Sequence, residues 1–71
     1  MIKVGDLVRF KFPEKIAGAL TALKVAKRMQ ARIDGRTGLA IEIHGGNILT
    51  DFEGEIILVH MMFLEVINES R

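Results

Sequence analysis

The sequence predicts a mainly β domain of about five short antiparallel strands, with one helix between the first and the second strand. Three observations lead to this fold class. Side chains follow a two-residue period at residues 7–12, 39–43, 48–52 and 55–60. Only one segment follows the helical period of 3.6 residues. Residues typical of tight turns separate the later strands, as in a small antiparallel barrel or a curled sheet.

The first strand is expected at residues 7–12. Val8, Phe10 and Phe12 share one face of this segment and positively charged side chains share the other, as in a half-buried strand. Pro13 ends the strand because proline cannot donate a hydrogen bond to a β ladder. The phenylalanines of this segment are therefore interpreted as core residues.

A helix is expected from Pro13 to about Arg32. Apolar side chains gather on one side of it and positive charges on the other, so the helix is amphipathic. The apolar side holds Ile16, Ala19, Ala22, Leu23, Val25, Ala26, Met29 and Ile33. The end of this helix stays open. Residues 29–33 also alternate as a strand does, so a helix closing near Lys27 to Met29, followed by a strand to Ile33, is the alternative.

The remaining strands follow turn signals. Asp34-Gly35 predicts a chain reversal before a strand at residues 39–43, in which Leu39, Ile41 and Ile43 are expected to point inward.

Gly45-Gly46 predicts the next reversal, and Glu53-Gly54 the turn of a hairpin between residues 48–52 and 55–60. The apolar run that follows is too long for one alternating strand. It predicts a short turn at residues 61–63 and a final strand at 64–67.

Three segments of the chain resemble small SH3-like barrel proteins, including short ones common in tailed bacteriophages. They are residues 4–10, with the opening Gly-Asp-Leu-Val, residues 37–43, and residues 57–67, with the closing Leu-Glu-Val-Ile. The resemblance implies an SH3-like barrel and suggests a phage accessory or virion-associated protein, but it carries no common biochemical function. Residues 13–34 depart from the pattern, because the first connection in such barrels is usually a loop.

Length and composition limit the classes of function. The chain has 71 residues and no cysteine, so it is expected to form a single domain over residues 1–71, without disulfides or thiolate metal sites. Apolar residues make up 49% and the mean hydropathy is +0.28, which is high for a small monomer and predicts apolar surface that meets a partner. The net charge of +1 excludes a chain that is basic throughout.

The expected location is the cytoplasm, either the host cytoplasm or a virion if the protein is phage-encoded. No apolar run approaches the length of a membrane span, and no charged segment followed by an apolar one marks a signal peptide.

No enzyme, cofactor or small-molecule substrate is expected. His44 and His60 are the only histidines, and cysteine and tyrosine are absent. A triad of a hydroxyl, a histidine and Asp6 or Asp51 has no supporting motif. A metal site of His44, His60 and Asp51 is less plausible than a loop histidine and a strand-end histidine. Gly35-Arg36-Thr37-Gly38 resembles a phosphate-binding loop in spelling only, since a strand and not a helix follows.

Proline-rich peptides are rejected as ligands, because their grooves are lined by aromatic rings and the chain has neither tryptophan nor tyrosine. The leading hypothesis is a protein-interaction module that self-associates or docks on a protein partner. Its interface is expected on the apolar helix stripe of Ile16, Leu23, Ala26, Met29 and Ile33. The alternative is a small nucleic-acid-binding module that contacts phosphates through Lys24, Lys27, Arg28 and Arg32.

Overall fold

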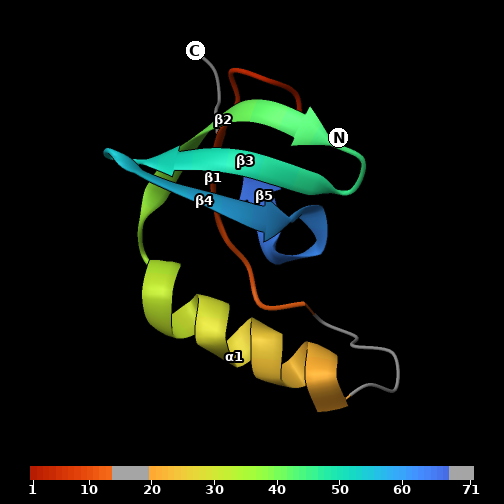
Figure 1. Ribbon diagram of the computed structural model, residues 1–71. Coiled ribbons are helices and arrows are strands. Elements are labelled where there is room, and N and C mark those ends of the chain that lie inside the picture. The colour runs from red at the N-terminus through yellow and green to blue at the C-terminus, as the bar shows by residue number, and fades with distance from the viewer. Residues whose placement is uncertain (14–19, 68–71) are drawn as a thin grey trace.

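The computed structural model describes residues 1–13 and 20–67, and in this part of the chain a five-stranded antiparallel sheet packs against one helix (Figure 1). In chain order the elements are β1 (Leu7–Phe10), α1 (Leu20–Ile33), β2 (Thr37–His44), β3 (Asn47–Phe52), β4 (Glu55–His60), the 3₁₀ turn η1 (Met61–Phe63) and β5 (Leu64–Val66). The strand order across the sheet is β4-β3-β2-β1-β5, and every neighbouring pair is antiparallel. The predicted mainly β class, with a helix between the first two strands, is confirmed.

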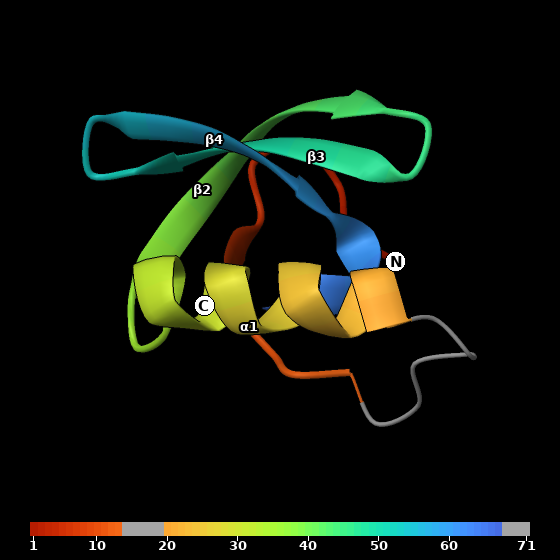
Figure 2. The ribbon, with the colours of Figure 1, turned by 60° about the horizontal axis from the view of Figure 1, so that its bottom comes forward.

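The core lies between the inner face of the sheet and α1. Figure 2 shows the helix lying across this face. Buried apolar side chains come from every strand, from η1 and from the helix, and they include Val8, Phe10, Ala26, Ile33, Ala40, Ile48, Phe52, Ile57, Val59, Phe63 and Leu64. A single layer of sheet would leave this face in water, so α1 supplies the second layer that a core needs.

α1 runs without interruption to Ile33, so the alternative of a strand ending there is wrong. Gly35 follows with φ of +80°, the left-handed conformation in which glycine commonly ends a helix, and the Arg36 amide donates to the Ile33 carbonyl across the turn. Residues 14–19 of the expected helix, including Ile16 and Ala19, lie outside the described residues.

β2 corrects one prediction about facing. Leu39 was expected to point inward, but it is largely exposed, and Gly38 and Ala40 point inward instead. A Cβ atom at Gly38 would lie 2.5 Å from Cγ2 of Thr50, so only glycine permits this close approach of β2 and β3. Small residues therefore occupy the inward positions of β2, and the larger neighbour points to the outer face.

The alternation of β2 changes at a β-bulge between Ala40 and Glu42. Ile41 is the extra residue there, and it is half-buried. Beyond the bulge Ile43 pairs with Ile48 and so shares its inward face, but it remains largely exposed at the end of the ladder. One inserted residue reverses the facing of all that follow, which a uniform two-residue period cannot reveal.

The chain closes as predicted from the sequence, with a short turn at residues 61–63 and a final strand from Leu64, although β5 ends at Val66. The His60 Nδ1 accepts a hydrogen bond from the Met62 amide at 3.1 Å and caps η1. Phe63 is buried and stacks on Phe10 with ring centroids 6.4 Å apart. η1 thereby fastens the end of β4 to the core beside β1.

β1 is shorter than expected and ends at Phe10. Phe12 lies beyond the strand and is half-buried, and its ring meets the Phe10 ring edge to face with centroids 6.2 Å apart.

No helix in the described residues is long and apolar enough to cross a membrane.

Candidate docking surface

The apolar helix stripe expected to meet a partner faces the chain's own sheet. Ala26 and Ile33 have no exposed surface, and Met29 is half-buried against the core. Leu23 is half-buried as well, and Ile16 lies outside the described residues. The assignment of Ala26 and Ile33 to a partner interface is corrected by this burial, because the inner face of the sheet already uses them.

A cluster of apolar side chains lies instead on the outer face of the sheet, opposite α1. We call it the outer patch; it consists of Leu7, Leu39, Leu49, Ile56 and Leu58. The register shows that these residues share a face, because directly opposed residues of an antiparallel pair point to the same side. Leu7 opposes Leu39, and Leu49 opposes Leu58. Leu39 opposes Asp51, which in turn opposes Ile56, so one row crosses four strands.

The outer patch is open to solvent in the described part of the chain. Leu7 and Leu39 are 37% and 39% exposed, and Ile56 and Leu58 are 50% and 51% exposed. A strand that faces water on one side normally places polar residues there. None of the five side chains of the outer patch belongs to the buried core.

Polar side chains surround the outer patch. Arg9, Glu65 and Thr37 form the row on one side of it, and the Arg9 Nε lies 2.7 Å from the Glu65 carboxylate. His44 and Asn47 form the row at the other side. An apolar centre inside a polar rim is the usual anatomy of a protein interface.

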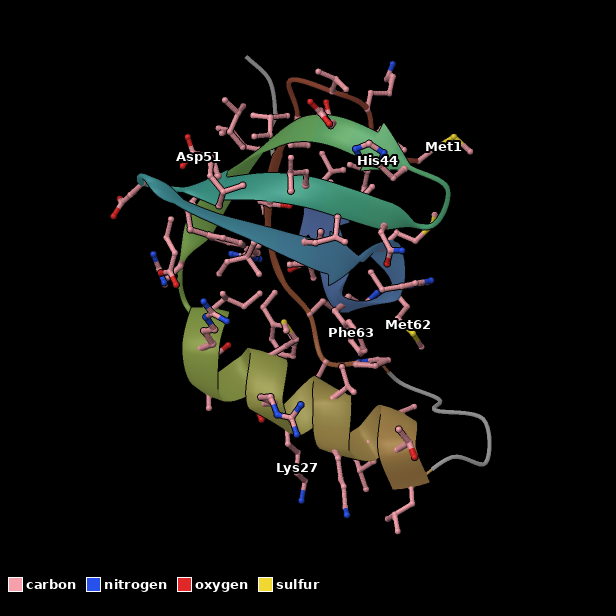
Figure 3. The ribbon with its side chains drawn as sticks, viewed as in Figure 1. Met1, Lys27, His44, Asp51, Met62 and Phe63 are labelled. Carbon is pink, nitrogen blue, oxygen red and sulfur yellow. The ribbon has the colours of Figure 1, made fainter. Side chains whose placement is uncertain are left out.

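Two carboxylates lie on the outer face among these side chains: Glu42, which opposes Leu49, and Asp51, which opposes Leu39. The Asp51 Oδ1 accepts a hydrogen bond from the Gly54 amide at 2.7 Å, so this carboxylate is occupied by the β3–β4 turn. Figure 3 shows Asp51 near that turn and His44 at the opposite end of the ladder. The sheet surface between them carries the apolar side chains.

The residues of the predicted basic face do not all remain free cations, because Arg32 forms an ion pair. Arg32 donates from Nη2 to the Glu55 carboxylate at 2.9 Å, and Arg36 donates to the same carboxylate at 2.9 Å. Hydrogen bonds from Arg36 and Arg32 hold the pKa of the Glu55 carboxyl below its ordinary value. Arg36 also lies over the Phe52 ring, 5.4 Å from its centroid. Arg32 thus joins α1 to the β3–β4 hairpin, a role that the sequence pattern missed.

Lys24, Lys27 and Arg28 are exposed and have no ion pair among residues 1–13 and 20–67. Lys27 points away from the sheet (Figure 3). The basic face therefore keeps three free cations, on the side of the molecule opposite the outer patch.

The two histidines make different contacts. His44 Nε2 is 2.7 Å from the Glu42 carboxylate, whereas His60 caps η1. The described residues bring together no group of three metal-ligating side chains and enclose no pocket.

The outer patch could have been found in part from the sequence. Ile56 and Leu58 occupy alternate positions of a strand whose intervening residues are also apolar, so both faces of β4 are hydrophobic. Finding Leu39 would have required knowing which residues of β2 face outward.

None of the family models, curated proteins or solved structures with which the chain was compared matches it.

Proposed function

We propose that the chain is a non-enzymatic protein-interaction module that self-associates or docks on a protein partner through the outer patch. The observation that carries the proposal is the exposure of Leu39, Ile56 and Leu58 on the outer face of the sheet. Burial of such side chains on association contributes about 25 cal/mol per Å² of apolar surface removed from water. The helix stripe that was first expected to bind is replaced by this surface.

The proposed architecture is an SH3-like barrel. The strand order and the 3₁₀ turn before the last strand support it, together with the bulge that bends β2. A phage accessory or virion-associated protein, working in the host cytoplasm or the virion, is the proposed setting.

Sedimentation equilibrium of the purified chain tests the proposal. We expect a mass above the 7.9 kDa monomer that rises with concentration. Leu58→Lys places a charge in the part of the outer patch that lies on β4 and should return the mass to that of a monomer. Val4→Lys is the matched control, since Val4 is exposed but lies outside the patch. A wild-type chain that stays monomeric would contradict the proposal, unless it binds a protein that Leu58→Lys does not bind.

A nucleic-acid-binding module is the second candidate, favoured by the free cations Lys24, Lys27 and Arg28. Contacts from these three side chains to duplex DNA should give a slope of about −2.7 for log affinity against log salt. Replacing Lys27 and Arg28 by alanine should flatten the slope by about two units. Fluorescence anisotropy with a labelled duplex measures both, and binding with no salt dependence rejects this candidate.

A further inference from the structure

Among residues 1–13 and 20–67, β4 pairs only with β3 and so forms one edge of the sheet. In an antiparallel ladder, successive residues direct their backbone N–H and C=O groups alternately toward the neighbouring strand and away from it. The direction for each residue of β4 therefore follows from any one hydrogen bond of the ladder.

The Met61 amide donates to the Gly46 carbonyl at 2.9 Å, directly beyond the last pair of the β3–β4 ladder. Counting back from this bond, Val59 and Ile57 face β3, whereas Leu58 and Ile56 face away from it.

The turn at the other end of the ladder gives the same answer. Glu53 and Gly54 have φ of 56° and 99°, as in a two-residue type I′ hairpin loop, so Glu55 faces β3. No hydrogen bond within the described residues engages the backbone groups of Ile56 or Leu58.

This edge lacks the features that prevent strands from pairing. Natural edges are blunted by short length, lysine, proline or bulges. β4 is six residues long, contains neither lysine nor proline, and pairs with β3 without a bulge. The opposite edge, β5, is three residues long and carries Glu65. The two edges of one sheet are therefore unequal, and only β4 offers a regular row of donors and acceptors.

We propose that β4 pairs with β4 of a second copy of this chain, antiparallel and across a two-fold axis, so that two five-stranded sheets become one. This proposal deepens the proposed function and rests on it, because it names the partner and the contact. With Ile57 on the axis, Ile56 lies opposite Leu58 of the second copy, and the outward backbone groups of both strands are paired.

The strand is complementary to itself. With Ile57 on the axis, Ile56, Ile57 and Leu58 meet only apolar side chains of the second copy, and Val59 lies opposite its Glu55. Glu55 is at the strand end, where Arg32 and Arg36 bind its carboxylate. A two-fold axis perpendicular to the sheet also keeps both outer patches on one side, so they join into a larger apolar surface. A two-fold contact needs one patch that fits its own copy, which this edge supplies.

Hydrogen exchange of individual amides tests the pairing. In wild-type protein raised from about 20 µM to about 1 mM, we expect the amides of Ile56 and Leu58 to slow by about tenfold or more as the dimer fills. The amides of Ile57 and Val59 face β3 and should be slow at both concentrations. Association without any slowing at Ile56 and Leu58 overturns the edge pairing and leaves the proposed function standing. Absence of self-association overturns the edge pairing and leaves only docking on a different protein from the proposed function.

Leu58→Pro provides a second, independent test. Proline removes the outward amide but no bond to β3, so the fold should tolerate it, and dimer affinity should fall by about tenfold or more. Leu58→Val is the matched control, because valine has as many side-chain carbons as proline but keeps the backbone amide hydrogen. Equal affinities of the two variants would overturn the pairing; if Leu58→Pro fails to fold, the exchange experiment on the wild type decides.

Discussion

The two ends of the sheet are built alike inside and differently outside. Both β1–β5 and β3–β4 are antiparallel pairs whose inner residues are buried, such as Leu64 at one end and Phe52 at the other. On the outer face, the β1–β5 pair carries the Arg9–Glu65 ion pair and a single leucine, Leu7, whereas the β3–β4 pair carries Leu49, Ile56 and Leu58 beside Asp51. Folding requires the inner residues of both ends. The two ends therefore differ only in their outer surfaces, and β3–β4 is the end that we propose to bind.

The largest expected effect concerns the inner face. Phe52→Ala should reduce the free energy of unfolding by about 3–5 kcal/mol, because Phe52 has no exposed surface and its removal leaves a cavity. Ile56→Ala, on the outer face of the same hairpin, should cost less than about 1 kcal/mol. Urea denaturation followed by circular dichroism measures both. Equal losses for the two variants would show that the outer patch stabilises the fold as much as the inner face does, and would contradict the difference between the two faces.

A smaller loss is expected at Gly38, in the strand that connects the two ends. A Cβ atom there would lie 2.5 Å from Thr50 Cγ2 and 2.8 Å from the Phe52 ring. Gly38→Ala should therefore destabilise the fold by about 1–3 kcal/mol through overpacking. Thermal unfolding checks this. Gly46→Ala is the comparison, because the added carbon there meets the His60 ring and not the side chains of Thr50 and Phe52. An unchanged melting temperature for Gly38→Ala would refute the close approach of β2 and β3.

The ion-pair cluster at the β3–β4 turn makes stability depend on pH. The Glu55 pKa is lower in the folded than in the unfolded chain, so the folded state binds fewer protons at this site. The resulting stabilisation is present above the unfolded pKa, near 4.5, and is lost as the pH falls through the lower folded pKa. The free energy of unfolding should thus decrease less steeply below pH 4.5 in Glu55→Gln than in the wild type. Glu53→Gln controls for the loss of one charge, and identical pH slopes of wild type and Glu55→Gln would contradict the arrangement.

The smallest effect is expected at the Arg9–Glu65 pair. Both side chains are largely exposed, at 56% and 38%, and such pairs contribute about 0–1 kcal/mol. Arg9→Ala and Glu65→Ala should each change stability by no more than this. Neither should alter self-association, since the pair lies in the polar rim of the outer patch. A large effect on association would move the binding end of the sheet to β1–β5.

Local sequence patterns predicted the order of elements and the position of the β3–β4 hairpin. Residues 55–60 form β4 as expected, because Glu53-Gly54 suits a two-residue turn, and burial alternates along the strand although residues 56–59 are all apolar. β2 was harder. Its inward positions hold Gly38 and Ala40, which an apolar pattern overlooks, and the bulge at Ile41 reverses the facing within the strand.

The binding surface was less predictable than the fold. An amphipathic helix presents its apolar stripe to the nearest apolar surface, and here that surface is the chain's own sheet, so Ala26 and Ile33 are buried. The sequence pattern of Arg32 is that of an exposed cation, and only the tertiary fold brings it to Glu55. The outer patch is assembled from four strands, whose alignment depends on registers that no short segment encodes.

The central claim is that association uses the outer face and edge of the β3–β4 end. Backbone amide chemical shifts, followed by nuclear magnetic resonance as the protein is diluted, test it most directly. The account predicts that concentration-dependent shifts gather at Leu49, Ile56 and Leu58, while those of Arg9 and Glu65 stay constant. Shifts confined to β1–β5 or to α1, or a spectrum that does not change with concentration, would contradict it.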